Sequence, residues 1–146
     1  VAMDTLLYKM GSIMEEKSGY ELVPTYSYMR VYKKGDVLKR HKDRKSCEIS
    51  TTMNLGGEPW PIYLSKNPKE INKRYKPSKV KGVKINLNPG DMLIYRGCEL
   101  EHWRNKFEGN DCVQVFLHYN KAGKNSNLME GRLHLGLPSD IKKEDK

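Results

Sequence analysis

The sequence alternates short β-prone segments with turns over most of its length. The first segment, TYSYMRVY at 25–32, is rich in Tyr and β-branched residues. Similar segments follow at 47–55, 60–64, 83–87, 92–95 and 113–119. Gly, Pro, Asn and Asp separate them, as in GGEP at 56–59 and NPGD at 88–91. Seven or eight short strands with such turns are typical of a β-sandwich or barrel, so we expect a mainly β core over about 25–119.

An amphipathic helix is predicted before this core, over residues 5–18. Asp4 or Thr5 can cap its start, and Gly19 stands where a helix-ending glycine belongs. Its apolar positions recur at helical spacing and are Leu6, Leu7, Met10, Ile13 and Met14. We expect this stripe to pack on the sheet.

Three other stretches carry separate expectations. The two prolines near 60–64 predict an edge strand or a bulge there. The basic segment 65–79 has no apolar period and is predicted to be an exposed loop, either a lid over a site or simply solvated. Residues 133–137 are a possible edge strand, and 138–146 a weakly ordered tail. We expect one domain over 1–146.

Composition excludes several classes of protein. No apolar run approaches 18 residues, which argues against a transmembrane helix, and the polar N-terminus with Asp4 argues against a signal peptide. A cytosolic location is therefore expected. Cys47, Cys98 and Cys112 are widely spaced, which argues against a disulfide framework and a thiolate zinc site and favours reduced thiols. The net charge of +9 suits a protein that binds nucleic acid or other anions, but it is more often found in a merely soluble basic protein.

The segment 28–43 ends in His41-Lys42-Asp43. On an extended chain, residues two apart point to the same side, so this pair offers two adjacent metal ligands. His102 can complete a 2-His-1-carboxylate face, which leaves three coordination positions open and suits mononuclear non-haem iron. His118 is the alternative second histidine, although we expect it to pack near the site. His134 is expected on the surface.

Residues 26–119 resemble the Fe(II)/2-oxoglutarate-dependent oxygenases of the prolyl-hydroxylase-like group, especially small members from marine phages and bacteria. The matching segments are YMRVYKKGDVLKRHKDR, WPIYL, NPGDMLIYRG, ELEHWR and QVFLHY. The resemblance implies a double-stranded β-helix (a cupin-like jelly roll) with His41 and Asp43 at a strand end and His102 across the barrel mouth. It also implies Fe(II), the cosubstrate 2-oxoglutarate and O2, with release of succinate and CO2. The location would then be the cytoplasm of a bacterium or of a phage-infected host.

One departure from the family concerns the far carboxylate of 2-oxoglutarate. Relatives place a Lys or Arg nine to eleven residues beyond the second histidine, where this chain has Asp111, Cys112 and Val113. Because a buried anion needs a cation, another residue must serve. The first candidate is Arg104, two residues past His102, and the second is Arg30. Further candidates near the cosubstrate are Tyr32, which matches a cosubstrate-contacting tyrosine of relatives, and the neutral donors Gln114 and Thr52.

Three functions remain open from the sequence. The first is a dioxygenase that hydroxylates a protein side chain, a small molecule or a nucleobase; an anionic substrate would suit Arg40, Arg44 and Arg96. The second is a cupin-like metal-binding protein without 2-oxoglutarate. The third is a basic nucleic-acid-binding module with an incidental metal motif. Aromatic residues are too scattered to favour nucleic acid, and Trp103 is expected to be a packing aromatic.

Overall fold

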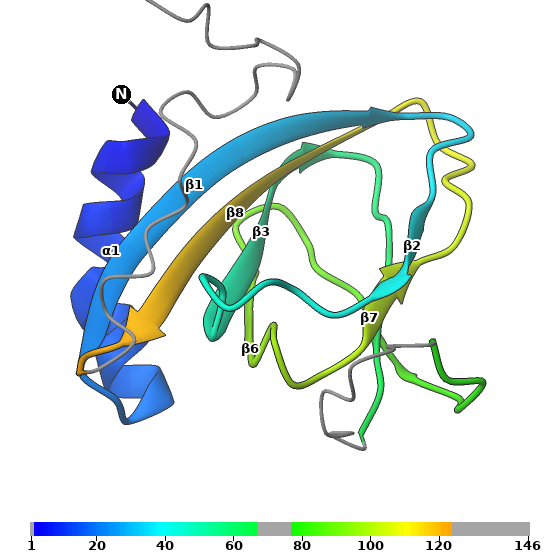
Figure 1. The fold of residues 1–146 in the computed structure, drawn as a ribbon. Helices are drawn as coiled ribbons and strands as arrows, with labels where there is room; N and C mark the ends of the chain where they lie inside the picture. The colour runs from blue at the N-terminus through cyan, green and yellow to red at the C-terminus, as the bar shows by residue number, and fades with distance from the viewer. Residues whose placement is uncertain (1, 67–76, 124–146) are drawn as a thin grey trace, which may run out of the picture.

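The computed structural model describes residues 2–66 and 77–123, which form one helix and two antiparallel four-stranded sheets that face each other (Figure 1). The elements are α1 (Ala2–Ser18), β1 (Leu22–Lys33), β2 (Leu38–His41), β3 (Ile49–Gly57), β4 (Ile62–Leu64), β5 (Val83–Ile85), β6 (Met92–Tyr95), β7 (His102–Arg104) and β8 (Asp111–Lys121). The predicted strand at 133–137, the tail 138–146, His134 and most of the predicted loop at 65–79 lie outside the described residues.

The strand order shows a jelly roll. One sheet has the order β1-β8-β3-β6 and the other β2-β7-β4-β5, so strands that follow one another in the chain mostly belong to opposite sheets. The long β1 and β8 pair along nearly their whole length, from Leu22 opposite Lys121 to Lys33 opposite Asp111. The predicted mainly β, cupin-like double-stranded β-helix with an N-terminal helix is confirmed.

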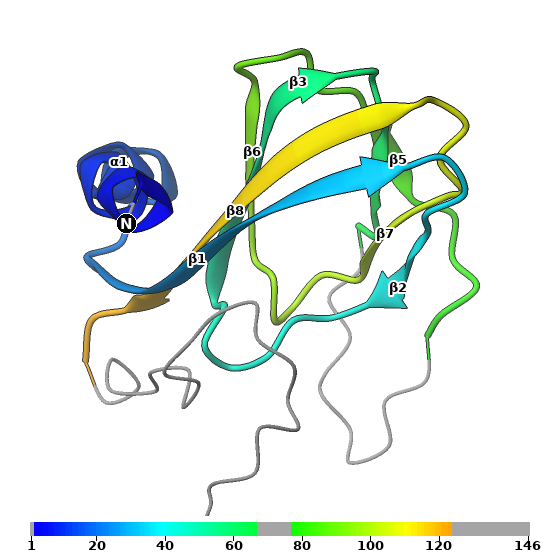
Figure 2. The same cartoon turned by 90° about the horizontal axis from the view of Figure 1, so that it is seen from above.

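The helix α1 lies along the first sheet, on the side away from the second sheet (Figures 1 and 2). Leu7 and Met14 are buried in one cluster with residues of β3 and β8. Ile13 was predicted to join this stripe but is 42% exposed, because the buried arc of the helix is narrower than its apolar pattern. Within the described chain, no helix is long and apolar enough to cross a membrane.

Of the caps predicted for α1, the structure differs at the first end and agrees at the second. The helix begins at Ala2 and not at residue 5, so Asp4 stands in its first turn and is not its cap. There its carboxylate favours the positive end of the helix dipole and accepts a hydrogen bond from Ser27. Gly19 ends the helix as predicted, with φ of +74° and its N–H donated to the Glu15 carbonyl.

The predicted edge position of the strand near 60–64 is wrong. Pro59 and Pro61 precede β4, which begins at Ile62 and pairs with β5 on one side and β7 on the other. Their missing N–H groups therefore cost no ladder hydrogen bond. The NPGD turn is as predicted: Gly90 has φ of +92° and the Asp91 N–H donates to the Asn88 carbonyl.

The space between the sheets is polar on one side. Ser50, Thr52 and Asn54 of β3 are fully buried and lie opposite His118, Phe116 and Gln114 of β8, respectively. Buried polar side chains need hydrogen-bond partners, so this face of the first sheet marks the part of the interior where chemistry is to be sought.

Candidate metal centre

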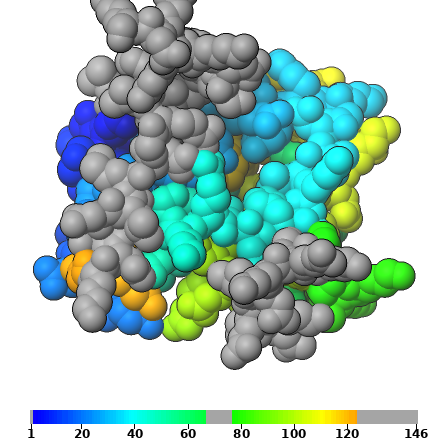
Figure 3. Space-filling view, viewed as in Figure 1, coloured from blue at the N-terminus to red at the C-terminus, as the bar shows by residue number. Residues whose placement is uncertain are grey.

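Two histidines meet where the second sheet pairs β2 with β7. His41 ends β2 and His102 begins β7, and the two are direct partners in the antiparallel ladder. Their ring centroids are 4.3 Å apart. Strand pairing therefore brings together two imidazoles that are 61 residues apart in the sequence. Residues around β2, drawn in cyan, are visible on the face of the molecule shown in Figure 3.

Each imidazole is oriented by a backbone carbonyl. His41 Nδ1 lies 2.7 Å from the Lys39 carbonyl oxygen, and His102 Nδ1 lies 3.0 Å from that of Leu100. A carbonyl oxygen can only accept, so both Nδ1 atoms carry a proton. Both Nε2 atoms are thereby left to face Asp43, which is the tautomer and orientation of a metal-binding histidine.

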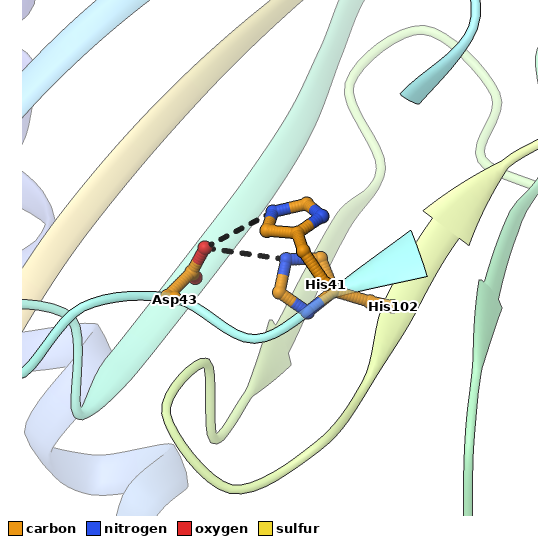
Figure 4. Close-up of side chains that lie close together, drawn as sticks. All are labelled: His41, Asp43 and His102. Carbon is orange, nitrogen blue, oxygen red and sulfur yellow. Dashed lines mark ion pairs between the residues drawn. The ribbon is translucent and has the colours of Figure 1, made fainter. Parts of the chain in front are cut away.

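Asp43 lies just beyond the end of β2 and completes the group (Figure 4). Its Oδ1 is 3.4 Å from His41 Nε2 and 3.3 Å from His102 Nε2. Two ligands bound at about 2.1 Å and at a right angle would be about 3 Å apart, so these separations are close to those around one divalent ion. Two imidazole nitrogens and a carboxylate oxygen suit such an ion, with positions left open for other ligands.

The electrostatics of the group also favour a cation. Burial raises the pKa of Asp43, but the adjacent imidazoles of His102 and His41 outweigh it and hold that pKa well below its usual range. Burial lowers the pKa of His41, but the Asp43 carboxylate and the Lys39 carbonyl raise it more. The carboxylate is therefore ionised and attracts positive charge, from a proton or from a metal ion.

A loop of the chain fixes the Asp43 carboxylate from behind. The Asp43 N–H donates to the Gly97 carbonyl at 2.9 Å, and the Ser50 hydroxyl donates to Asp43 Oδ2 at 3.2 Å. A Cβ at position 97 would be 2.3 Å from Oδ2 and 2.6 Å from the Ser50 hydroxyl, so only glycine fits there. Sequence reasoning missed both residues as parts of the site, although the polar face of β3 was visible.

Arg104 is a buried arginine without an acidic partner in the part of the chain that the structure describes. It follows His102 by two residues on β7 and is 1% exposed. Its Nη1 donates to the Trp60 carbonyl, and its Nη2 is 3.3 Å from both Thr52 Oγ1 and Gln114 Oε1. In residues 2–66 and 77–123, Nε has no hydrogen-bond partner and no Asp or Glu pairs with the guanidinium. A buried cation thus stands among neutral groups only.

The other predicted cosubstrate residues divide into two sets. Thr52 and Gln114 contact Arg104, and Tyr32 is buried against Trp60, the ring of which also lies under Arg104. Arg30 is different, because it is exposed and its guanidinium carbon lies 4.7 Å from the centroid of the Tyr32 ring. Of the two arginines, Arg104 is therefore the buried one and Arg30 the exposed one.

The other basic and aromatic residues singled out in the sequence, Arg40, Arg96 and Trp103, have partners of their own. Arg40 pairs with buried Glu101 and stacks 3.5 Å from the centre of the Trp103 ring, which stacks on Tyr63 in turn. Trp103 is therefore a packing aromatic, as predicted. Arg96 pairs with Glu99 on the surface.

His118 lies behind the metal centre and not in it. Its Nδ1 is 2.9 Å from the Ser50 hydroxyl, and its ring packs 4.5 Å from that of Tyr26. The structure thus groups His102, and not His118, with His41. Cys47 and Cys112 are buried thiols as predicted, whereas Cys98 is half-buried; none of the three forms a disulfide.

Comparison with known proteins finds similar structures but no related sequence. No protein-family model matches the chain, and no curated protein matches it. Its fold is similar to an oxidoreductase of the 2OG-Fe(II) oxygenase family from Burkholderia pseudomallei, with a TM-score of 0.59 and 14% identity over 80% of this chain. The match spans 57% of that protein's length. At this identity the likeness supports the jelly-roll fold.

Two cupin domains also match, each with a TM-score below 0.5. A cupin domain from Bordetella pertussis gives a TM-score of 0.42 at 13% identity, covering 68% of this chain and 93% of that one. The Cupin_2 domain of an XRE family transcriptional regulator from Enterobacter cloacae gives 0.41 at 12%, covering 68% and 96%. The prolyl-hydroxylase-like group and the phage or bacterial source remain predictions from the sequence.

We predict that His41→Ala and His102→Ala each weaken Mn(II) binding at least about 100-fold, because losing a ligand costs more than the 10–100-fold typical of its hydrogen-bond partners. Titration followed by the electron paramagnetic resonance of free Mn(II) measures this. Lys42→Ala, between the two ligands in sequence, is the control and keeps wild-type affinity. Unchanged Mn(II) affinity in His41→Ala would contradict the centre.

We also predict that Gly97→Ala weakens Mn(II) binding by about 10–100-fold, since its Cβ must displace the Asp43 carboxylate or the Ser50 hydroxyl. The matched control is Gly11→Ala in α1, where an added Cβ meets nothing within 4 Å. Gly11→Ala should keep Mn(II) affinity and stabilise the fold by about 0.5–1 kcal/mol in urea unfolding. Equal Mn(II) affinities in the two variants would refute the positioning of Asp43 by Gly97.

Proposed function

We propose that this protein is an Fe(II)- and 2-oxoglutarate-dependent dioxygenase that hydroxylates a substrate, either a protein side chain or a small molecule. The observation that carries the proposal is Arg104, a buried guanidinium with an unpaired Nε two residues from a metal-binding histidine. A metal centre alone does not explain a buried cation. A cosubstrate with a carboxylate at its far end does.

His41, Asp43 and His102 would hold the metal. Fe(II) held there would supply oxidative chemistry, in which O2 and 2-oxoglutarate are converted to succinate and CO2 while a substrate C–H bond is hydroxylated. The two imidazoles and the carboxylate are already oriented before any ion binds, by the carbonyls of Lys39 and Leu100 and by Ser50. Such preorganisation reduces the cost of assembling the centre.

Arg104 would bind the far carboxylate of 2-oxoglutarate. Side chains two apart on a strand lie roughly 7 Å apart on the same face, a span that suits a five-carbon dicarboxylate with its other end at the metal. The guanidinium can offer Nε and an Nη in a fork to two carboxylate oxygens. Thr52 and Gln114 hold Nη2 in place, so the fork is fixed before binding.

Charge balance supports the same ligand. The metal dication and Arg104 carry three positive charges and Asp43 one negative charge, which leaves two positive charges inside the barrel. The dianion 2-oxoglutarate neutralises both, and burial makes such neutralisation favourable. Burial also lowers the pKa of Arg104, although a guanidinium stays charged at neutral pH.

We predict that Arg104→Gln weakens 2-oxoglutarate binding by about 10–100-fold, the equivalent of about 1.5–3 kcal/mol for a charge-assisted hydrogen bond. The measurement is the visible charge-transfer band of the anaerobic Fe(II) protein during titration with 2-oxoglutarate. The band should still form at saturation in Arg104→Gln and be absent in His41→Ala. Arg30→Gln is the matched control and should titrate like the wild type.

One outcome would count against this function, and another against the assignment of Arg104. Without a band in the wild type with Fe(II) shown to be bound, the oxygenase proposal fails and a cupin-like metal-binding protein is the better description. If Arg104→Gln binds 2-oxoglutarate like the wild type and Arg30→Gln does not, Arg30 and not Arg104 binds the far carboxylate.

A further inference from the structure

A second set of metal-ligand side chains lies behind the centre and shares Asp43 with it. One ligand atom each of Asp43, Cys47 and His118 lies within 4.8 Å of the others. Cys47 is 1% exposed and His118 is 3% exposed. The three residues come from the loop after β2, the approach to β3, and β8, so only the fold brings them together.

The chemistry of this trio differs from that of the first centre. It replaces one imidazole by a thiol, and a set of sulfur, nitrogen and carboxylate oxygen suits borderline divalent ions such as Zn²⁺ and Co²⁺. Such a set leaves a fourth tetrahedral position for water or another group. The phenol oxygen of Tyr26, 3.2 Å from Cys47 Sγ, provides a further polar atom beside it.

Ser50 supports the trio in the way that outer hydrogen bonds support known metal sites. Its hydroxyl donates to Asp43 Oδ2 at 3.2 Å and is 2.9 Å from His118 Nδ1. Metal-binding imidazoles usually hold their second ring nitrogen in such a contact, which fixes the ring. The Tyr26 ring packs on the same imidazole, with the two ring centroids 4.5 Å apart.

We propose that Asp43, Cys47 and His118 form a second metal site, selective for borderline divalent ions of the zinc class. Binding exchanges the thiol proton of Cys47 for the metal and releases that proton to solvent. The site needs neither 2-oxoglutarate nor Fe(II), so it goes beyond the proposed oxygenase function. It was not predictable from cysteine spacing, because a single thiol contributes and its partners are remote in sequence.

The other two cysteines have different surroundings. Cys98 Sγ donates to the Arg44 carbonyl at 2.7 Å and is half-buried. Cys112 is buried and accepts a hydrogen bond from Gln114, in the cluster that contains Trp60. Cys112 is therefore a matched control, since it is an equally buried thiol on the far side of the interior.

Co²⁺ titration of the full chain tests the proposal through the near-ultraviolet thiolate-to-Co(II) charge-transfer band. We expect this band in the wild type, in Cys112→Ser and in the double variant His41→Ala/His102→Ala, which lacks the first centre. Cys47→Ser should lose it entirely and His118→Ala should weaken Co²⁺ binding at the thiol at least about tenfold. Added Zn²⁺ should bleach the band.

Fold integrity is checked by near-ultraviolet circular dichroism of each metal-free variant, and the near-isosteric Cys47→Ser is the least disruptive change. Absence of a thiolate band in wild type at saturating Co²⁺ would overturn the proposal. So would a band that survives Cys47→Ser or disappears in Cys112→Ser. None of these outcomes bears on 2-oxoglutarate binding, so this proposal and the oxygenase function fail independently.

Discussion

Charge buried between two sheets is the constraint on which the rest of this structure depends. An ionised Asp43 and a cationic Arg104 both lie inside the jelly roll, where unpaired charge is costly. Two imidazoles compensate the carboxylate, whereas the guanidinium has only neutral partners among the described residues. The polar inner face of β3 provides hydrogen-bonding dipoles that stabilise these two buried charges. An apolar β3 would remove the Ser50 hydroxyl from Asp43 and the Thr52 hydroxyl from Arg104.

The two sheets have different roles in meeting this constraint. The second sheet provides the two imidazoles and the guanidinium: β2 and β7 pair His41 with His102, and the period of a strand puts Arg104 on the same side. The first sheet provides neutral hydrogen-bonding groups, Ser50 and Thr52 from β3 and Gln114 from β8. The site therefore depends on the register within each sheet and on the approach of one sheet to the other.

Sequence reasoning succeeded where local periodicity decides the structure. The alternating segments gave the strands, and spacing by two gave the proximity of His41 to Asp43 and the inward direction of Arg104. It failed where distant contacts decide. The backing of Asp43 by Gly97, the link from Ser50 to His118 and the interior position of β4 all depend on which strands become neighbours. Ile13 is exposed for a similar reason, since the sheet covers only part of the apolar arc of α1.

The central claim is that one metal ion and one dicarboxylate occupy the barrel together, joined by His102 and Arg104 on a single strand. A crystal structure grown anaerobically with Mn(II) and 2-oxoglutarate tests it most directly. The account predicts Mn(II) bound by His41, Asp43 and His102, with the far carboxylate of 2-oxoglutarate on the Arg104 guanidinium. Mn(II) bound by other residues, or a 2-oxoglutarate carboxylate that lies away from Arg104, would contradict it.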